Sequence, residues 1–113
     1  MNERDAREVA AVLAERDRQR ALGHFDEDDY PDATGSPSSI DALAYVRRDY
    51  EFAEQIGRIT WAHVLREEVA EALAEEDFER LRAELHQVAA VAIRWAGALT
   101  KRMQDDDDDS TDR

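Results

Sequence analysis

The sequence contains no cysteine, which excludes a disulfide framework and any metal site built on thiolates. Only 4 glycines and 2 prolines occur in 113 residues, so most of the chain is free to form regular secondary structure. No apolar run approaches the roughly 20 residues that a membrane-spanning helix needs, so we expect no membrane partner. The charged, amphipathic start MNERDAREVA lacks the apolar stretch of a secretory signal, and a cytoplasmic location is therefore expected.

Large apolar side chains are also scarce. Hydrophobic residues make up 42% of the chain, but 19 of them are alanines, which bury little surface. Short domains bury a smaller fraction of their surface than long ones, so a monomer with this composition would be marginally stable. We therefore expect a homodimer or a homotetramer.

Positive charge is in the minority, with 15 Lys and Arg against 28 Asp and Glu and a net charge of −13. Part of the excess lies in residues 104–113, which we expect to form a disordered acidic tail after a single domain over 1–103. Six acids and one base lie in that tail, so the body still carries −8. An acidic body repels phosphate backbones, which argues against a nucleic-acid partner. A phosphorylated small molecule would need a divalent cation to bridge acid and phosphate.

Apolar residues recur at spacings of three and four, which predicts an all-α fold, most simply a four-helix bundle. Ser38 or Ser39, Thr60 and Asp77 are the expected N-caps of the last three helices, and Gly57 is an expected helix stop. The segment between the first two helices contains both prolines and two of the glycines, which is typical of a long loop. The expected helices cover residues 4–22, about 39–56, 61–76 and 78–103.

Two pairs of polar residues interrupt the apolar stripes. Glu68 and Glu71 are three residues apart in the third expected helix, as are Glu84 and Gln87 in the fourth, so each pair projects from one helix face. Antiparallel packing of these helices would bring three carboxylates and an amide oxygen around a hard cation such as Mg²⁺. The spacing alone equally fits solvated acidic faces or salt bridges to nearby arginines.

These acidic residues belong to a longer pattern. The sequence reads EEVAE at 67–71 and ELHQ at 84–87, with a short spacer of twelve residues between them. This pattern resembles the EExxE and ExxD motif of the MazG-like branch of the all-α nucleoside triphosphate pyrophosphohydrolases. The resemblance covers about residues 15–103, and the segments ERDRQ, GHFDEDDYPDATG and ITW are similar to those of small actinobacterial and phage members.

The resemblance implies a hydrolase that cleaves the α–β phosphoanhydride of a nucleoside triphosphate with Mg²⁺, or alternatively Mn²⁺, giving a nucleoside monophosphate and pyrophosphate. It also implies a MazG-like four-helix bundle that assembles as a dimer or a tetramer. Carried over by motif position, Glu68, Glu71 and Glu84 are the expected metal ligands, and Gln87 is the fourth. Glu67 takes the leading position, with an orienting or water-positioning role, so Glu67 and Glu68 are the expected catalytic residues.

Gln87 departs from the family pattern, which has Asp at this position. An amide offers a neutral carbonyl oxygen, removes one negative charge and cannot act as a base. The alternative function is therefore a catalytically weak or inactive MazG-like relative that serves as a nucleotide-binding or interaction module. A helical assembly factor is a third interpretation, which sets the resemblance aside.

Several residues outside the motif have two interpretations each. Arg94 and Lys101 are candidates for contacts with substrate phosphate, although basic residues late in a helix also suit its dipole. Trp61 and Trp95 are expected in the core or at an interface rather than stacked on a base. His63 could ligate a metal, but a surface pair is the simpler interpretation.

Overall fold

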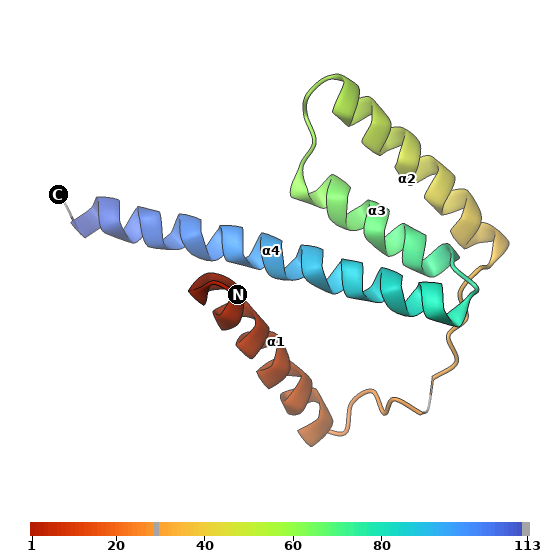
Figure 1. Ribbon diagram of the computed structural model, residues 1–113, viewed down its shortest axis with the longest axis horizontal. Helices are drawn as coiled ribbons and strands as arrows, with labels where there is room; N and C mark the ends of the chain where they lie inside the picture. The colour runs from red at the N-terminus through yellow and green to blue at the C-terminus, as the bar shows by residue number, and fades with distance from the viewer. Residues whose placement is uncertain (29, 112–113) are drawn as a thin grey trace. The chain divides into compact units, whose positions relative to one another are not determined.

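The computed structural model describes the backbone of residues 1–28 and 30–111, and the side chains of these residues as far as Asp107. This part of the chain contains four α-helices and no strand, which confirms the predicted all-α class (Figure 1). None of these four helices is both long enough and apolar enough to cross a membrane. The helices are α1 (Glu3–Ala21), α2 (Pro37–Gln55), α3 (Trp61–Ala74) and α4 (Phe78–Thr111).

The chain forms two compact units, and α4 contributes to both. The terminal unit consists of Met1–Pro31 and Ile93–Arg113, and the central unit consists of Asp32–Ala92. The expectation that residues 1–103 act as a single domain stays a prediction, as does the MazG-like type of bundle.

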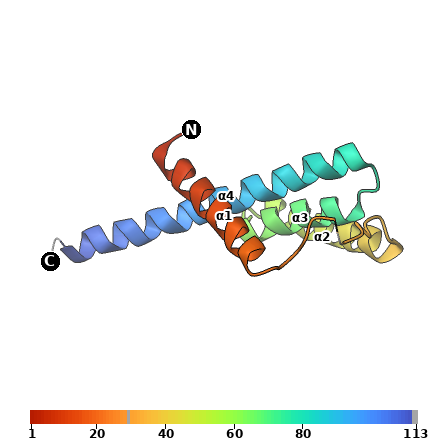
Figure 2. The same ribbon diagram turned by 90° about the horizontal axis from the view of Figure 1, so that it is seen from below.

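In the terminal unit, α1 packs against the later part of α4, as both views of the chain show (Figures 1 and 2). The Thr100 hydroxyl donates a hydrogen bond to Oε1 of Glu8 at 2.7 Å. Gly97 is buried, and a Cβ at this position would press against the aliphatic part of the Arg4 side chain. No residue of α1 is buried.

The helix starts follow capping chemistry. Thr60 and Asp77 each accept a hydrogen bond from the backbone N–H three residues further on, at 3.2 and 3.0 Å, which confirms both predicted N-caps. The cap of α2 is Ser36 rather than either serine at 38–39, so that prediction is wrong. The reason is Pro37, whose missing N–H costs nothing in the first helical turn and whose fixed φ suits it.

Of the two predicted helix ends, one is confirmed and the other is wrong. Gly57 follows the end of α2 with a φ of 68°, as the predicted stop requires. By contrast, α4 continues to Thr111, eight residues beyond the predicted end at Met103, so that prediction is wrong. No Gly or Pro follows Met103 to interrupt the backbone hydrogen bonds. The disorder of the acidic tail stays a prediction, and its residues 112–113 lie outside the described part of the chain.

In the central unit, α2 and α3 run antiparallel and side by side, and α4 begins after a short turn at 75–77 (Figure 1). The buried hydrophobic side chains of this unit are mostly small, and none exceeds a leucine in size. They are Ala53, Ala70, Ala72, Leu81 and Val91. The thin core leaves room for polar side chains between the helices.

A backbone hydrogen bond joins the loop before α2 to the end of α3. The N–H of Gly35 donates to the carbonyl oxygen of Leu73 at 2.9 Å. Gly35 has a φ of 77°, a conformation that favours glycine, and a Cβ at this position would overlap the side chain of Glu76. This hydrogen bond ties the chain just before α2 to the end of α3.

Candidate metal centre

Three carboxylates converge between α3 and the beginning of α4 in the central unit. Glu68 and Glu71 lie one turn apart on α3, and Glu84 lies in the second turn of α4. One carboxylate oxygen from each residue lies within 4.8 Å of the others. The turn at 75–77 is too short to separate the two helices, so it returns α4 alongside α3 and brings the three side chains together.

Two buried oxygen atoms of this cluster have no hydrogen-bond partner among the described residues. Oε2 of Glu68 and Oε2 of Glu84 are both inaccessible to solvent and accept no hydrogen bond from the described residues. A buried acceptor without a partner costs free energy, and an ionised one costs more. A hard divalent cation binds to oxygen atoms of this kind, so the residues present fit a Mg²⁺ or Mn²⁺ ion.

Burial raises the pKa of Glu68 and that of Glu84 above the ordinary carboxyl value. The charges of Glu71 and Glu84 add to the rise for Glu68, and the charge of Glu71 and a hydrogen bond with it add to the rise for Glu84. Burial also raises the pKa of Glu67, with the charge of Glu71 as the next cause. Without metal the centre therefore holds protons more tightly than free carboxyls do, and a bound cation would replace them.

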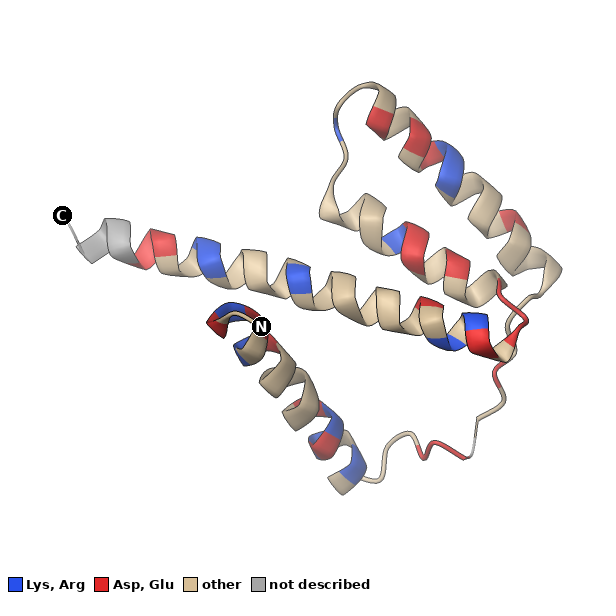
Figure 3. Cartoon of the chain, in the orientation of Figure 1, with Lys and Arg blue, Asp and Glu red and all other residues tan. Residues whose placement is uncertain are grey.

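Helix α2 adds a cation and a phenol to the surroundings of the centre. Nη2 of Arg47 lies 3.7 Å from Oε1 of Glu71. Burial raises the pKa of Tyr50, and the charges of Glu67, Glu54 and Glu68 add to the rise. Along α2 a basic segment lies between acidic ones, and along α3 one basic segment is followed by acidic ones, as Figure 3 shows.

From the sequence, no functional role was predicted for Arg47 or for Tyr50. The signal was present, because residues 43, 47 and 50 recur at spacings of four and three and so share one helix face. Leu43 and Tyr50 are both half-buried, which identifies this face as the one turned inward.

The remaining predicted site residues lie in different places. Glu67 is half-buried on α3 beside Glu68, outside the group of three converging oxygens. Gln87 lies one turn beyond Glu84 on α4 and is exposed, and its part in metal binding stays a prediction. Arg94 and Lys101 are exposed residues of the terminal unit, and their contacts with phosphate stay predictions.

His63 serves the start of α3. Its Nδ1 accepts a hydrogen bond from the backbone N–H of Thr60 at 3.1 Å, which completes a reciprocal capping box. Its Nε2 lies 3.6 Å from Oδ2 of Asp49 on α2. Both ring nitrogens are thus engaged in structural contacts, in agreement with the simpler of the two interpretations.

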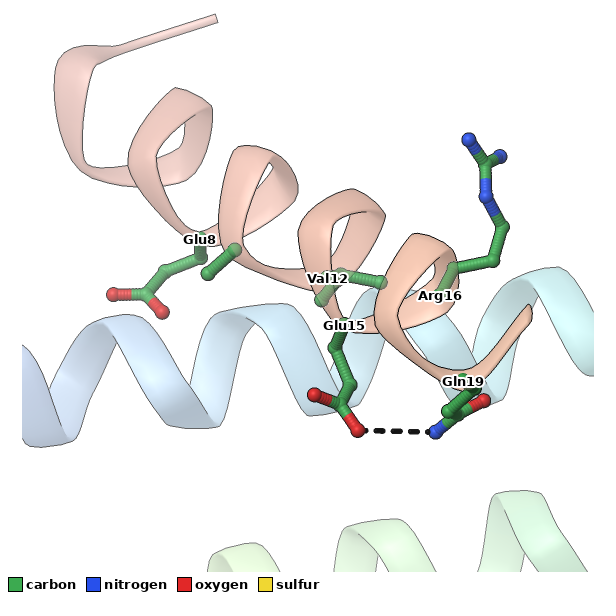
Figure 4. Close-up of a pocket in the computed structure, with 6 residues that line it drawn as sticks. Glu8, Val12, Glu15, Arg16 and Gln19 are labelled. Atoms are coloured by element: carbon green, nitrogen blue, oxygen red, sulfur yellow. Dashed lines mark hydrogen bonds between the residues drawn. The ribbon is translucent and has the colours of Figure 1, made fainter. Parts of the chain in front are cut away.

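A shallow hollow of about 360 Å³ lies along α1 in the terminal unit (Figure 4). Two of its polar groups pair with each other, because Glu15 accepts a hydrogen bond from Nε2 of Gln19 at 3.2 Å. A hydrogen bond from Arg18 lowers the pKa of Glu15 to about 2. The lining comes from one helix face and no set of groups converges there, so we assign it no binding function. The lining residues are Glu8, Ala11, Val12, Glu15, Arg16 and Gln19.

No protein-family model, curated protein or solved structure matches the chain. Membership of the MazG-like family therefore stays a prediction drawn from the acidic motif. The function has to be inferred from the carboxylate centre and its surroundings.

Proposed function

We propose that this protein is a Mg²⁺-dependent nucleotide pyrophosphohydrolase of the MazG-like kind, which converts a nucleoside triphosphate to a nucleoside monophosphate and pyrophosphate. The observation that carries the proposal is the convergence of Glu68, Glu71 and Glu84, with two buried oxygens that have no partner among the described residues. Carboxylate oxygens are preferred ligands of Mg²⁺. The same three residues stand at the ligand positions of the acidic motif, so the motif and the spatial arrangement support one assignment.

The proposal gives each residue a task. Glu68, Glu71 and Glu84 hold the ion, which can be Mg²⁺ or Mn²⁺, and Gln87 offers a neutral oxygen as a fourth ligand. When bound, the ion polarises the phosphate oxygens and offsets the negative charge that develops on them. Glu67 orients the water that adds across the α–β phosphoanhydride, acting as a hydrogen-bond acceptor. Arg94 and Lys101 remain the sequence-based candidates for contacts with phosphate.

A second function is favoured by one specific observation. Gln87 replaces the Asp of the motif, and its side chain is exposed. A centre with three carboxylates binds a dication more weakly than one with four, because each carboxylate contributes charge as well as an oxygen atom. The alternative is therefore a MazG-like relative of little or no activity that binds a nucleotide or a protein partner.

We also propose that the protein works as a homodimer or a homotetramer. Seven large hydrophobic side chains of the central unit are more than half exposed, whereas the buried hydrophobic residues of this unit are mostly alanines. Burial of exposed side chains of this size against a second copy would stabilise both copies. The seven residues are Ile40, Tyr45, Phe52, Ile56, Leu73, Phe78 and Leu85.

A pyrophosphate-release assay tests the enzymatic proposal. The purified chain is incubated with Mg²⁺ and a panel of canonical and modified nucleoside triphosphates, and Glu71→Gln is assayed in parallel. We expect release from at least one nucleotide, and loss of at least about 90% of it in Glu71→Gln, because the variant loses a charged ligand. Release that is equal in the two proteins would contradict the proposal. A wild-type chain that binds Mg²⁺ without releasing pyrophosphate from any nucleotide would favour the inactive relative.

A further inference from the structure

Arg47 of α2 lies beside the carboxylate centre without being one of its proposed ligands. Its Nη2 is 3.7 Å from Oε1 of Glu71, which is longer than a hydrogen bond. The side chain of Glu71 is 21% exposed, whereas that of Arg47 is 53% exposed. The carboxylate is thus held between helices while the guanidinium stands largely in water. A long side chain in this situation retains rotamer freedom and can exchange one partner for another.

The charge of Arg47 acts on more than this one contact. It opposes the rise in the pKa of Glu67 on α3 and the rise in the pKa of Glu84 on α4. The charges of four other glutamates raise these pKa values. They are Glu51, Glu54, Glu71 and Glu75. Arg47 is therefore a cation set among acids that come from three helices.

Charge balance makes such a cation important for an anionic ligand. The four glutamates of the motif carry four negative charges when ionised, and one divalent cation offsets two of them. A nucleoside triphosphate brings further negative charge, so a metal ion alone leaves the complex strongly negative. A guanidinium has a planar fork of N–H donors that matches two phosphate oxygens at once, and it keeps its charge at any pH of interest.

We infer that Arg47 has two successive partners: Glu71 in the metal-free protein, and the phosphates of a bound nucleotide once Glu71 serves as a metal ligand. This inference rests on the proposed function and deepens it, because it names a phosphate-binding residue within the central unit. In the first state Arg47 offsets the repulsion among the carboxylates. In the second it gives the substrate a positive contact on the α2 side of the centre.

A purely structural ion pair between α2 and α3 would behave differently. Its removal would lower the melting temperature and leave the affinity for metal and for phosphate unchanged. The inferred role predicts two opposite changes in binding. Neutralising Arg47 should strengthen metal binding, because a competing positive charge is lost, and should weaken phosphate binding, because a donor fork is lost.

The test uses the full chain with Arg47→Met, which keeps the length of the side chain and removes its charge. Arg48→Met is the matched control, because Arg48 is exposed and lies about 100° further round the same helix. Mn²⁺ affinity is measured by electron paramagnetic resonance of the free ion. Affinity for α,β-imido nucleoside triphosphates, which resist hydrolysis at this bond, is measured by calorimetry in saturating Mg²⁺. Thermal melts check that each variant is folded.

We expect Arg47→Met to bind Mn²⁺ up to about fivefold more tightly, the upper limit that the energy of an exposed ion pair sets. We expect it to bind the nucleotide analogue about tenfold or more weakly, and Arg48→Met to match the wild type in both. Arg47→Lys should keep the wild-type Mn²⁺ affinity and show an intermediate loss for the analogue, and it replaces Arg47→Met if that variant does not fold.

The other outcomes separate the two levels of the proposal. A wild-type chain that binds no Mn²⁺ overturns both the metal centre and the role of Arg47. If the wild type binds Mn²⁺ and Arg47→Met leaves both affinities unchanged, the role of Arg47 is overturned while the metal centre stands. If Mn²⁺ binding tightens and analogue binding is unchanged, Arg47 is a counter-ion only, and the phosphate-binding half of the inference is overturned.

Discussion

Neutralising one carboxylate of the centre should stabilise the metal-free protein. Glu84→Gln keeps the shape of the side chain and removes the charge from a residue with a buried, unpartnered oxygen. Its carboxylate lies within 4.8 Å of oxygens of Glu68 and Glu71. At that separation and an effective dielectric constant of about 20, two like charges repel by roughly 3 kcal/mol. Partial exposure and partial protonation reduce this repulsion, so we expect a gain of about 1 kcal/mol.

A gain of about 1 kcal/mol corresponds to a rise of about 4 °C in the melting temperature of a chain of this size. Circular dichroism melts are run for the wild type and Glu84→Gln, each with a chelator and with millimolar Mg²⁺. Mg²⁺ should raise the melting temperature of the wild type by mass action and have little effect on the variant. Glu79→Gln is the control, since it makes the same chemical change at an exposed position of the same helix.

Two results would refute this reasoning. A metal-free Glu84→Gln that melts at or below the wild-type temperature would mean that the three carboxylates do not repel one another in the folded state. An equal response to Mg²⁺ in wild type and variant would mean that Glu84 is not a ligand.

Further predictions concern pH, the fourth ligand and assembly. In metal-free buffer the free energy of unfolding should fall as pH rises from about 4.5 through the raised pKa values of Glu67, Glu68 and Glu84, because the folded state binds these protons more tightly than the unfolded chain. Melts across a pH series check whether the free energy of unfolding falls with rising pH. The lowered pKa of Glu15, about 2, makes this free energy rise with pH instead, but only below about pH 4.5. Gln87→Asp should tighten Mg²⁺ binding and lower the metal-free melting temperature, as calorimetry and melts can measure; if neither changes, position 87 lies outside the centre. Light scattering on the order of tens of micromolar should give two or four times 12.9 kDa, and a monomer would contradict the proposed assembly.

Local sequence signals predicted much of the helical structure because they act over a few residues. Thr60 and Asp77 each cap a helix through a hydrogen bond that spans three residues, and Gly57 adopts the left-handed backbone conformation that follows α2. The start of α2 was predicted two residues late, since a serine pair was preferred to a single serine followed by Pro37. The end of α4 was predicted eight residues early, because a run of Asp was interpreted as a stop although nothing in it breaks the backbone hydrogen bonds.

Local sequence signals also predicted one part of the candidate site and missed another. The convergence of Glu68, Glu71 and Glu84 follows from the three-residue spacing within α3 and from the short turn between α3 and α4. Both are visible in the sequence. The approach of Arg47 does not follow from local spacing, because it depends on how α2 is rotated and shifted along α3. That placement is set by packing between helices. No pattern within one helix specifies it.

The contact between Gly35 and Leu73 has a consequence for how this chain can vary in length. The hydrogen bond pins the loop immediately before α2, so the register of α2 against α3 is set downstream of residues 24–32. Insertions or deletions in residues 24–32 would then change the length of the loop and leave the contact between Arg47 and Glu71 intact. One residue inserted after Gly35 would instead displace α2 by up to a full backbone step. The loop is thus divided at this glycine into a part that tolerates changes in length and a part that does not.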